Sequence, residues 1–394
     1  MEISRLCSDA EPYIIEQRRY FHRHPELSGC EKNTAAAICR QLESLGIPYE
    51  RLHTCFGVVG RIDGKYPGRT IALRADTDAL PVQEETDCSY ASENDGVMHA
   101  CGHDAHTAML LGAARVLSEI REELHGTVLL LFQPGEENGG GAPDMVAYLK
   151  EHGGADQIIG LHIWSTVPAG EILLIPKTVF SGACAIFLHI AGRGGHGARP
   201  DLTNDPIKAA CDLVLQITSI PSNYHSLFRQ CVISICTFHS GIRGNIVPDS
   251  ADLTGSIRYF QPDDLKILTG LINKKIRGIE LIHDVTVDFT MKNDGVPPVV
   301  NNEESIRRAR AIVKNVGGLA VSSQTDPICA GDNMAKLLAC WPGFYGVLGA
   351  GNPDIGASAP QHSAKYRIDE SVLRKGTEFM VQYAIDYLIG EASN

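Results

Sequence analysis

The 394-residue sequence predicts an α/β protein in which a mostly parallel sheet, with helices on both faces, is interrupted by a smaller α+β domain. The first observation is a set of short apolar runs without alternation, the pattern of strands buried on both faces of a parallel sheet. The second is helical periodicity between these runs, and the third is a central stretch whose strands alternate apolar and polar residues. The chain is also longer than one hydrophobic core usually supports, so two domains are expected.

The outer parts of the chain are expected to form the parallel sheet. Its strands are predicted at 71–76, 127–132, 157–162 and 344–350. Its helices are predicted from their apolar periodicity at 9–22, 32–46, 105–120 and 371–390. Gly46 is the expected C-cap of the second helix, and Asp104 is the expected N-cap of the third.

The middle of the chain has the order β-α-β-β-α-β, which is typical of a ferredoxin-like unit with helices on one face of its sheet. Its strands are predicted at 184–191, 231–238, 251–260 and 285–291, and its helices at 205–219 and 262–279. We therefore expect an inserted domain at 181–294, with residues 295–305 as the return linker. Residues 1–180 and 295–394 then form one outer domain.

Composition excludes several classes of partner. The formal net charge is −12, and both nucleic acids and membrane surfaces select for a basic face. No apolar run approaches the ~20 residues that span a bilayer, and the N-terminus has no apolar core of a signal peptide. The 12 cysteines show no disulfide-framework spacing. We expect a cytoplasmic protein without nucleic-acid or membrane partners.

Most of the candidate site residues follow or end the predicted buried strands, and five of them are potential metal ligands: Cys101, His103, Glu137, His162 and His362. In open parallel sheets, sites gather outside the carboxyl ends of the strands, so these segments should converge. One residue closes the strand at 71–76, two follow a Gln-Pro-Gly turn, one closes the strand at 157–162, and two precede a helix. These residues are Asp76, Glu136, Glu137, His162, Cys101 and His103, with His362 near the C-terminus.

This set of side chains favours a metal-activated water. Thiolate, imidazole and carboxylate all suit zinc, and imidazole with carboxylate also suits manganese. Of the adjacent glutamates, one can bind metal while the other takes a proton from water, and two ions ~3.5–4 Å apart can act together on an amide. Any one of these residues alone is more ordinary: a core histidine, a buried cysteine or a solvated turn. Their joint occurrence at strand ends is what indicates a site.

A glycine-rich motif follows the predicted strand at 184–191. Gly192, Gly194 and Gly197 match the spacing of a dinucleotide-binding loop. Such a loop should open a helix directly, but residues 199–201 (Arg-Pro-Asp) interrupt here. We reject nucleotide binding and expect these glycines to allow a tight turn from which His196 projects.

With these residues identified, the chain resembles the M20 metallopeptidase family, and within it the amidohydrolase branch. That branch includes hippurate hydrolase, the plant auxin-conjugate hydrolases and N-acetyl-diaminopimelate deacetylase. The resemblance covers nearly the whole chain, and the pair HACGHDAHT and FQPGEE is its most specific part. The matching motifs lie at 18–31, 72–84, 96–114, 132–137, 160–164, 192–200, 205–210, 244–260 and 368–373.

The resemblance implies a role for each candidate residue. Glu136 is implied as general base and acid, and Asp76 as the aspartate that orients a group on the metal side. Two divalent ions, Mn²⁺ or Zn²⁺, are implied as cofactors. Their implied ligands are Cys101, His103, Glu137, His162 and His362.

The inserted domain resembles the dimerisation domain of the family, so a homodimer through residues 181–294 is expected. His196 would reach a neighbouring active site and stabilise the oxyanion. Asn245 and Arg258 match positions that bind the substrate carboxylate, a task that suits the two parallel donors of a guanidinium. The implied substrate is an N-acyl or N-aroyl amino acid or a small peptide-like conjugate.

Two stretches depart from the branch. Asp201 follows Pro200 where a histidine is usual, and residues 331–334 read Gly-Asp-Asn-Met where Ser-Glu-Asp-Phe is usual. Neither departure touches the five expected ligands or Glu136. Both bear on which acyl group or amino acid is preferred.

Two other functions fit parts of the sequence. A cysteine-nucleophile amidase could use Cys101 with His99 or His103 as its base. That mechanism gives Glu137, His162 and His362 no role. A non-catalytic protein that binds conjugates on the same scaffold would fit the departure at 331–334, but it has no use for Glu136.

Overall fold

The structure is a computed structural model that describes residues 2–292 and 295–390. The chain divides into two compact units, each described by itself. Unit 1 comprises Met1–Val179, Val300–Asp326 and Asn333–Asn394, and unit 2 comprises Phe180–Val299 and Pro327–Asp332. The expected insertion at 181–294 did not include the segment 327–332, and its final residues, 293 and 294, lie outside the described residues.

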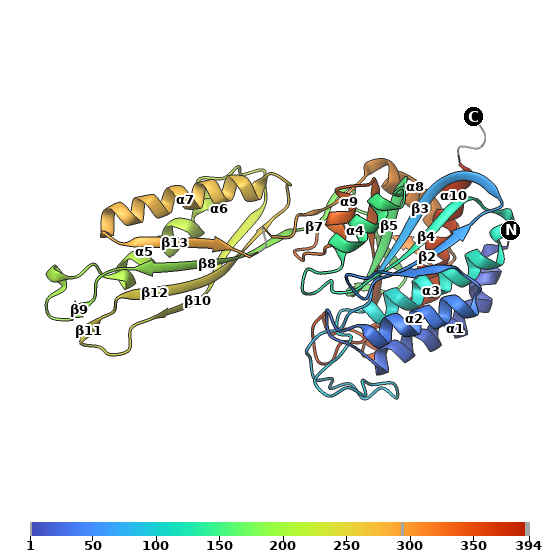
Figure 1. Cartoon of the computed structure of the whole chain (residues 1–394), viewed down its shortest axis with the longest axis horizontal. Coiled ribbons are helices and arrows are strands. Elements are labelled where there is room, and N and C mark those ends of the chain that lie inside the picture. The colour runs from blue at the N-terminus through green and yellow to red at the C-terminus, as the bar shows by residue number, and fades with distance from the viewer. Residues whose placement is uncertain (1, 293–294, 391–394) are drawn as a thin grey trace. The chain divides into compact units, whose positions relative to one another are not determined.

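Unit 1 is built on an eight-stranded sheet in the order β1-β2-β4-β3-β5-β16-β6-β15 (Figure 1). The central strands β4, β3, β5 and β16 run parallel, whereas β1 and β2 join one side antiparallel and β6 pairs antiparallel with β16. The strands are β1 (Tyr49–Arg51), β2 (Val58–Asp63), β3 (Tyr66–Asp76), β4 (His125–Gln133), β5 (Gln157–Pro168), β6 (Glu171–Leu173), β15 (Ala320–Val321) and β16 (Gly343–Gly351). Two further short strands, β7 (Lys177–Phe180) and β14 (Val299–Asn301), pair with each other.

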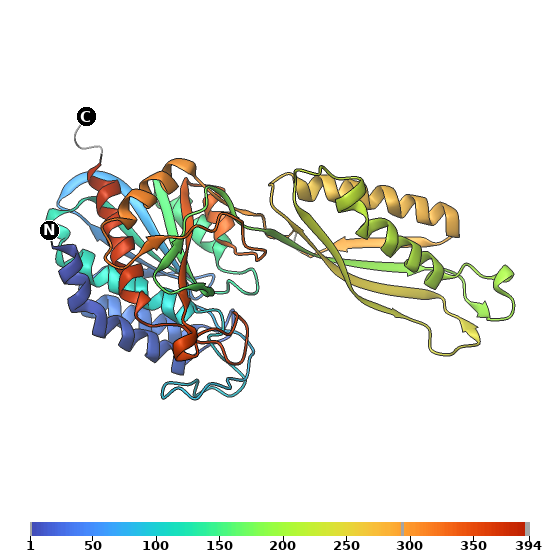
Figure 2. The same ribbon diagram turned by 180° about the vertical axis from the view of Figure 1, so that it is seen from behind.

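Helices cover both faces of this sheet (Figures 1 and 2). The larger layer contributes to one continuous core with the sheet, and α4 and α9 pack on the other face. The larger layer consists of α1 (Ile3–Arg23), α2 (Lys32–Ser44), α3 (His103–Glu119), α8 (Glu303–Val313) and α10 (Val372–Ile389). The opposite layer consists of α4 (Ala142–Glu151) and α9 (Met334–Leu338). The expected mixed α/β architecture with a mostly parallel sheet is confirmed.

Helix α3 is the central element of the larger layer, and nearly every residue along it is buried. A helix that is apolar on all sides needs cover on all sides, and α1, α2, α10 and the sheet provide it. A Cβ on Gly112 would lie 2.6 Å from Ile14 of α1, and one on Gly376 would lie 2.3 Å from Met109. These two glycines let α1 and α10 pack closely against α3, which fixes the position of its N-terminus.

The start of α3 differs from the prediction. The helix begins at His103 after Gly102, so Asp104 lies inside its first turn instead of capping it. Asp104 is fully buried, and its carboxylate accepts from the ring of His22 at 2.7 Å and pairs with Arg18 at 3.2 Å. The capping prediction was wrong because it considered only local sequence, whereas Asp104 is the partner of two cationic groups of α1.

Unit 2 is a four-stranded antiparallel sheet in the order β10-β12-β8-β13, with α5 and α7 packed on one face. The element order is the predicted β-α-β-β-α-β. Its main elements are β8 (Gly182–Ala191), α5 (Pro206–Thr218), β10 (Cys231–Ser240), β12 (Ser250–Tyr259), α7 (Asp264–His283) and β13 (Thr286–Met291), with a separate apolar core. Short elements are β9 (Gly195–His196), α6 (Ile220–Asn223) and β11 (Ile246–Val247).

Two other local expectations need adjustment. The expected linker 295–305 contains β14 and the first residues of α8, whose N-cap Asn302 accepts from the N–H of Ser305. The strand at 157–162 continues to Pro168, so His162 lies inside β5 and not at its end. Across the described ranges, none of the helices combines the length and the apolar composition required to cross a membrane.

Candidate metal centre

A glycine turn brings Cys101 and His103 to the same edge of the sheet. Gly102 between them has φ +95°, a left-handed conformation that glycine adopts without a steric penalty. A Cβ at this position would lie 2.4 Å from Ile163 and 2.7 Å from the hydroxyl of Tyr366. Both the backbone conformation and the available space therefore require glycine at this point.

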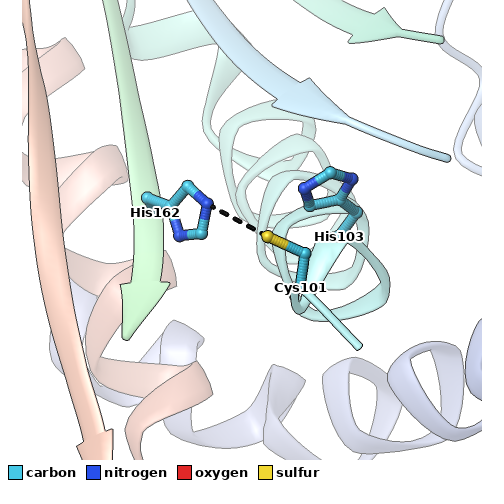
Figure 3. A group of neighbouring side chains, drawn as sticks. All are labelled: Cys101, His103 and His162. Carbon is cyan, nitrogen blue, oxygen red and sulfur yellow. Dashed lines mark hydrogen bonds between the residues drawn. The ribbon is translucent and has the colours of Figure 1, made fainter. Parts of the chain in front are cut away.

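His162, which belongs to strand β5, lies next to Cys101 (Figure 3). Strand β5 pairs with β3 only as far as Gly160, so His162 lies beyond the end of that ladder and reaches the carboxyl edge of β3. Its Nε2 lies 3.6 Å from the Sγ of Cys101, while its Nδ1 donates to the carbonyl of Ile163 at 2.8 Å. Because Nδ1 carries the proton, Nε2 presents its lone pair toward the thiol.

A hydrogen bond on one ring nitrogen also orients His103. Its Nδ1 donates to Asp78 at 3.1 Å, and its buried Nε2 has no hydrogen-bond partner among the described residues. Cys101, His103 and His162 each offer a ligand atom within 4.8 Å of the others. A histidine that ligates a metal usually donates its second nitrogen to a carboxylate or carbonyl, as both histidines do here.

Glu137 and His362 form a second group with Cys101, again with ligand atoms within 4.8 Å. The Oε1 of Glu137 is buried without a hydrogen bond within the described residues, 3.2 Å from His362 Nε2 and 4.0 Å from His103 Nε2. The N–H of Glu137 donates to Asp78 at 2.9 Å, and the N–H of His362 donates to the carbonyl of Ala100 at 2.7 Å. All five expected ligands therefore belong to two overlapping groups that share Cys101.

Burial and charge shift the titration of these groups. Burial raises the pKa of the Cys101 thiol well above its ordinary value, although His103 opposes it. Burial and then His106 lower the pKa of His162 well below its ordinary value. Burial acts to lower the pKa of His103, but Asp76 and Cys101 hold it well above its ordinary value. Protons and a metal ion compete for the same atoms, so a cation has to displace protons from Cys101 and His103.

Asp76 lies next to the ligand-type residues, and hydrogen bonds fix its carboxylate. It accepts from His106 Nδ1 at 2.5 Å and from Arg74 at 2.9 Å, and its carboxylate lies 3.7 Å from His103 Nε2. Burial acts to raise the pKa of Asp76, but His103, Arg74 and His106 hold it well below its ordinary value. His106 uses its other nitrogen to accept the N–H of Ile163 at 2.8 Å. With both nitrogens engaged, His106 supports Asp76 and is not a ligand.

Glu136 precedes Glu137 in the turn after β4, and its ligand atom lies within 4.8 Å of those of His103 and Glu137. Its Oε1 accepts the main-chain N–H of Asn333 at 2.9 Å. The two glutamates thus occupy different environments, one facing two histidines and the other held by a backbone donor. A division between ligand and proton carrier fits this difference.

Burial disfavours Cys101 as a metal-free nucleophile. Such a cysteine needs a low pKa and a base within hydrogen-bond reach, whereas burial raises the pKa of Cys101. His99 is buried, and burial lowers its pKa to about 4. Neither ring nitrogen of His99 has a hydrogen-bond partner among the described residues.

A second cluster, of His22, Glu84 and Cys88, also has ligand-type atoms within 4.8 Å of one another. Here the groups bind each other. His22 Nδ1 lies 2.7 Å from Asp104, and its Nε2 lies 3.3 Å from Glu84. Glu84 also accepts from the hydroxyl of Thr86 and from the N–H of Ser92. With both ring nitrogens of His22 engaged, we interpret this cluster as a structural hydrogen-bond network.

In unit 2, the structure places His196 and Asn245 on one small ribbon. His196 of β9 pairs with Ile246 of β11, and the N–H of Gly197 donates to the carbonyl of Asn245 at 2.9 Å. His196 is exposed, and its Nδ1 accepts the N–H of Ala198 at 3.0 Å, which leaves the proton of a neutral ring on Nε2. The motif glycines fit tight turns, since a Cβ on Gly194 would lie 2.5 Å from a backbone oxygen.

Arg258 lies at the other end of the same sheet. It pairs with Ala183 and Val232, whereas Ser250 pairs with Ala191 at the end where the β9–β11 ribbon begins. The eight residue steps from Ser250 to Arg258 span about 27 Å of strand. Within one chain, His196 and Arg258 are therefore too far apart to contact one small substrate.

Sequence reasoning missed Asp78, Arg74 and Asn333 as parts of the site. Asp78 holds both His103 and the Glu137 backbone, and a signal was available, because it stands two residues after Asp76 at the same strand end. Burial acts to raise the pKa of Asp78, but the hydrogen bond and charge of His103 keep it below its ordinary value. Arg74 gave no local signal, and the departure at 331–334 drew attention to Asn333 without showing its contacts, which are with residues distant in sequence.

Comparison with known proteins identifies the class. Residues 72–386 match Peptidase family M20/M25/M40. The chain is also 36% identical over 380 residues to thermostable carboxypeptidase 1 of Saccharolobus solfataricus, covering 95% of this chain and 96% of that protein. The chain therefore belongs to the M20 peptidase family and is a hydrolase that acts on amide bonds. The resemblance inferred from the motifs is confirmed.

Two other similar proteins, one compared by sequence and one by structure, add to this comparison. The chain is 36% identical over 303 residues to an N-acyl-L-amino acid amidohydrolase of Geobacillus stearothermophilus, covering 77% of this chain and 82% of that protein. It matches the crystal structure of the Bacillus subtilis YXEP protein, a dinuclear metal binding peptidase from the M20 family, with a TM-score of 0.85 and 28% identity. That match covers 97% of this chain and 99% of the YXEP chain.

Proposed function

We propose that this protein is a two-metal amidohydrolase that cleaves N-acyl or N-aroyl amino acids, or small peptide-like conjugates, into a carboxylate and a free amine. The observation that carries the proposal is the convergence of the five ligand-type side chains into two groups that share Cys101. In this proposal Cys101, His103, Glu137, His162 and His362 hold two divalent ions, Mn²⁺ or Zn²⁺.

The residues fit such ions. His103 Nε2 and Glu137 Oε1 are buried atoms without hydrogen bonds among the described residues, and burying such atoms unpaired costs free energy. Mixed thiolate, imidazole and carboxylate ligands suit zinc-like ions, and the imidazole and carboxylate members also suit manganese. The dinuclear metal site named for the YXEP protein supports two ions in place of one.

When bound, the ions would supply Lewis-acid activation of water and of the amide carbonyl. The chain supplies the proton transfers. Glu136 takes a proton from the attacking water and returns it to the leaving amine. Asp78 orients His103 and the Glu137 backbone. Asp76, which accepts hydrogen bonds from Arg74 and His106, places a negative charge next to the ligands.

The inserted unit supplies the groups that bind the rest of the substrate. Arg258 and Asn245 bind the carboxylate of the amino-acid part, and His196 donates from Nε2 to the oxyanion of the tetrahedral intermediate. The ~27 Å between the Arg258 and His196 ends of the sheet supports a homodimer, in which each site takes Arg258 from one chain and takes His196 and Asn245 from the other. The expected dimer through residues 181–294 is part of this proposal.

The substrate class follows from these groups and from the relatives. An N-acyl-L-amino acid amidohydrolase and a thermostable carboxypeptidase both align with most of this chain. Both kinds of enzyme act on an amide next to a free carboxylate. An arginine that binds this carboxylate selects such substrates over amides that lack it.

The test is a panel of acetyl, benzoyl and succinyl amino acids and simple dipeptides, assayed with Mn²⁺ or Zn²⁺ on protein of measured metal content. We expect amide hydrolysis that a chelator abolishes and added metal restores. Tight binding of every conjugate without turnover would show a binding protein instead. Activity that persists in metal-free protein and stops with a thiol alkylator would show a cysteine amidase.

A further inference from the structure

Asn333 is a buried polar residue next to the site whose side chain and main chain both make hydrogen bonds. It is fully buried, and its Oδ1 accepts from Arg74 at 3.0 Å and from Gln133 at 2.7 Å. Its Nδ2 donates to the carbonyl of Gly140 at 2.9 Å. Its main-chain N–H donates to Glu136 Oε1 at 2.9 Å. Asn333 thus connects the side chains of strands β3 and β4 with the turn after β4 and with Glu136, the residue proposed to transfer the proton.

In this chain, the hydrogen-bond partners of the Asn333 side chain fit an amide. Two donors meet Oδ1 and one carbonyl meets Nδ2, so the orientation of the side chain is determined by its neighbours. An aspartate has no hydrogen to donate, so its second oxygen would face the carbonyl oxygen of Gly140 at hydrogen-bond distance. Two buried acceptors in that position repel each other and leave both unsatisfied.

Arg74 connects this residue to the metal side of the site. The Arg74 guanidinium donates to Asp76 at 2.9 Å, to Asn333 at 3.0 Å and to Gln133 at 3.1 Å. Asp76 in turn accepts from His106 and lies 3.7 Å from His103. A single buried guanidinium therefore sets the spacing between the aspartate under the ligands and the backbone that holds Glu136.

We propose that Asn333 is a positioning residue for Glu136: its amide, fixed by Arg74, Gln133 and Gly140, holds its own main-chain N–H where that group orients the Glu136 carboxylate. This inference rests on the proposed role of Glu136. It also accounts for one departure noted in the sequence, because the branch usually has an acidic residue where Asn333 stands.

The decisive variant is Asn333→Asp, which changes one atom of the side chain to another of similar size. We expect kcat to fall roughly 10- to 100-fold with KM changed less than about twofold, because a small displacement of a catalytic group costs rate and not substrate binding. Metal content should be unchanged. A crystal structure of the variant should show the contact between the residue-333 N–H and Glu136 lengthened or lost. Asn333→Ala, which adds no charge, should lower kcat in the same direction.

Asn301 is the matched control. It is also buried, its Nδ2 donates to the carbonyls of Ile175 and Tyr345 at 2.9 and 3.1 Å, and its Oδ1 accepts the N–H of Tyr345 at 2.8 Å. Asn301→Asp should lower the Tm about as much as Asn333→Asp does. It should leave kcat near that of the native protein. Equal kcat losses in the two aspartate variants would reduce Asn333 to a structural role and overturn the inference.

The outcomes separate this inference from the proposed function. Hydrolysis of the substrate panel by the native protein tests the proposed function, whereas the ratio of variant to native kcat tests Asn333. Native-like kcat in Asn333→Asp, with Glu136 in its original place in the crystal structure, would refute the positioning role while the amidohydrolase stands. If the native protein turns over nothing, the crystal structure of the variant still decides whether residue 333 controls the Glu136 carboxylate.

Discussion

The two groups of candidate residues differ in how the fold holds them. In unit 1, the ligand-type side chains lie mostly buried, and His103 and His162 are each fixed by a hydrogen bond on the nitrogen that faces away from the group. In unit 2, the ring of His196 is exposed and accepts the N–H of Ala198, while Arg258 lies about 27 Å of strand from the end of the sheet where the β9–β11 ribbon begins. The first group is gathered and oriented within unit 1, whereas the residues of the second lie at opposite ends of the unit 2 sheet.

Under the proposed function, this contrast corresponds to two different tasks. Buried, prealigned groups suit ion binding and proton transfer, because their geometry has to be in place before the substrate arrives. Exposed groups on a separate sheet suit substrate binding and stabilisation of the oxyanion, which can be completed by a second copy of the chain. Variants in unit 1 should therefore affect metal content and kcat, and variants in unit 2 should affect kcat or KM with metal content intact.

The largest effect is expected from Glu136→Gln. Removal of the proton carrier should lower kcat by roughly 10³-fold or more, since general acid–base catalysis contributes about 10²–10⁴-fold. Metal content, measured by elemental analysis, should stay native because Glu137 and not Glu136 is the proposed ligand. A variant with near-native kcat would assign the proton transfer to another group.

His196→Ala should lower kcat by about 10²–10³-fold, the usual loss when one oxyanion donor is removed. Bound metal should be unaffected. If His196 acts in the site of the partner subunit, mixing this variant with Glu136→Gln should regain activity, because a mixed dimer contains one site with both residues. Mixed dimers without any gain in activity would place His196 in the site of its own chain or outside the reaction.

Cys101→Ser should weaken metal binding by at least about tenfold, because a hydroxyl is a much poorer ligand for zinc-like ions than a thiolate. Activity should return partly at high metal concentration, as followed by titration with Zn²⁺ or Mn²⁺ and turnover. Native metal affinity together with abolished turnover at every metal concentration would instead support the cysteine-nucleophile mechanism.

Arg258→Lys should raise KM about tenfold for substrates with a free carboxylate, because lysine lacks the two parallel donors of arginine. For the corresponding amino-acid amides, which have no carboxylate, native and variant enzymes should differ little in kcat/KM. Equal losses on both kinds of substrate would show that Arg258 supports the fold of unit 2 and does not bind the carboxylate.

The smallest effect concerns the His22–Glu84 network. Burial alone would raise the pKa of Glu84, but hydrogen bonds from His22, Ser92 and Thr86 lower it from 4.5 to about 2. A depressed carboxyl pKa stabilises the fold above pH 4.5, and this contribution disappears as the pH falls toward 2. Glu84→Gln should lower the Tm by a few degrees at pH 7, by about 2–4 °C per kcal/mol. Thermal unfolding between pH 3 and 7 should show this difference shrinking below pH 4.5, and a constant difference would exclude the ionic contribution.

The sequence predicted the strands and ligand-type residues of unit 1 because those signals are local. Buried strands have uninterrupted apolar runs, and polar residues at their carboxyl ends stand out against them. The β-α-β-β-α-β order of unit 2 was predicted from alternation in the same way. Local periodicity also located α3 and α10, although α1 starts several residues earlier than predicted.

The remaining features depend on contacts between residues distant in sequence. Asp104 looks like a helix cap until α1 brings Arg18 and His22 against it. Asn333 looks like a loop residue until Arg74 and Glu136 meet it from two strand ends. The segment 327–332 joins unit 2 through contacts such as the N–H of Ser181 with the carbonyl of Ile328, which no pattern near either residue indicates.

The central claim is that five side chains bind a pair of ions, and anomalous diffraction from crystals grown with Mn²⁺ or Zn²⁺ tests it most directly. We predict two strong peaks a few ångströms apart, each within coordinating distance of members of one set: Cys101, His103, Glu137, His162 and His362. A map without peaks among these residues, or with its strongest peak at His22, Glu84 and Cys88, would contradict this account.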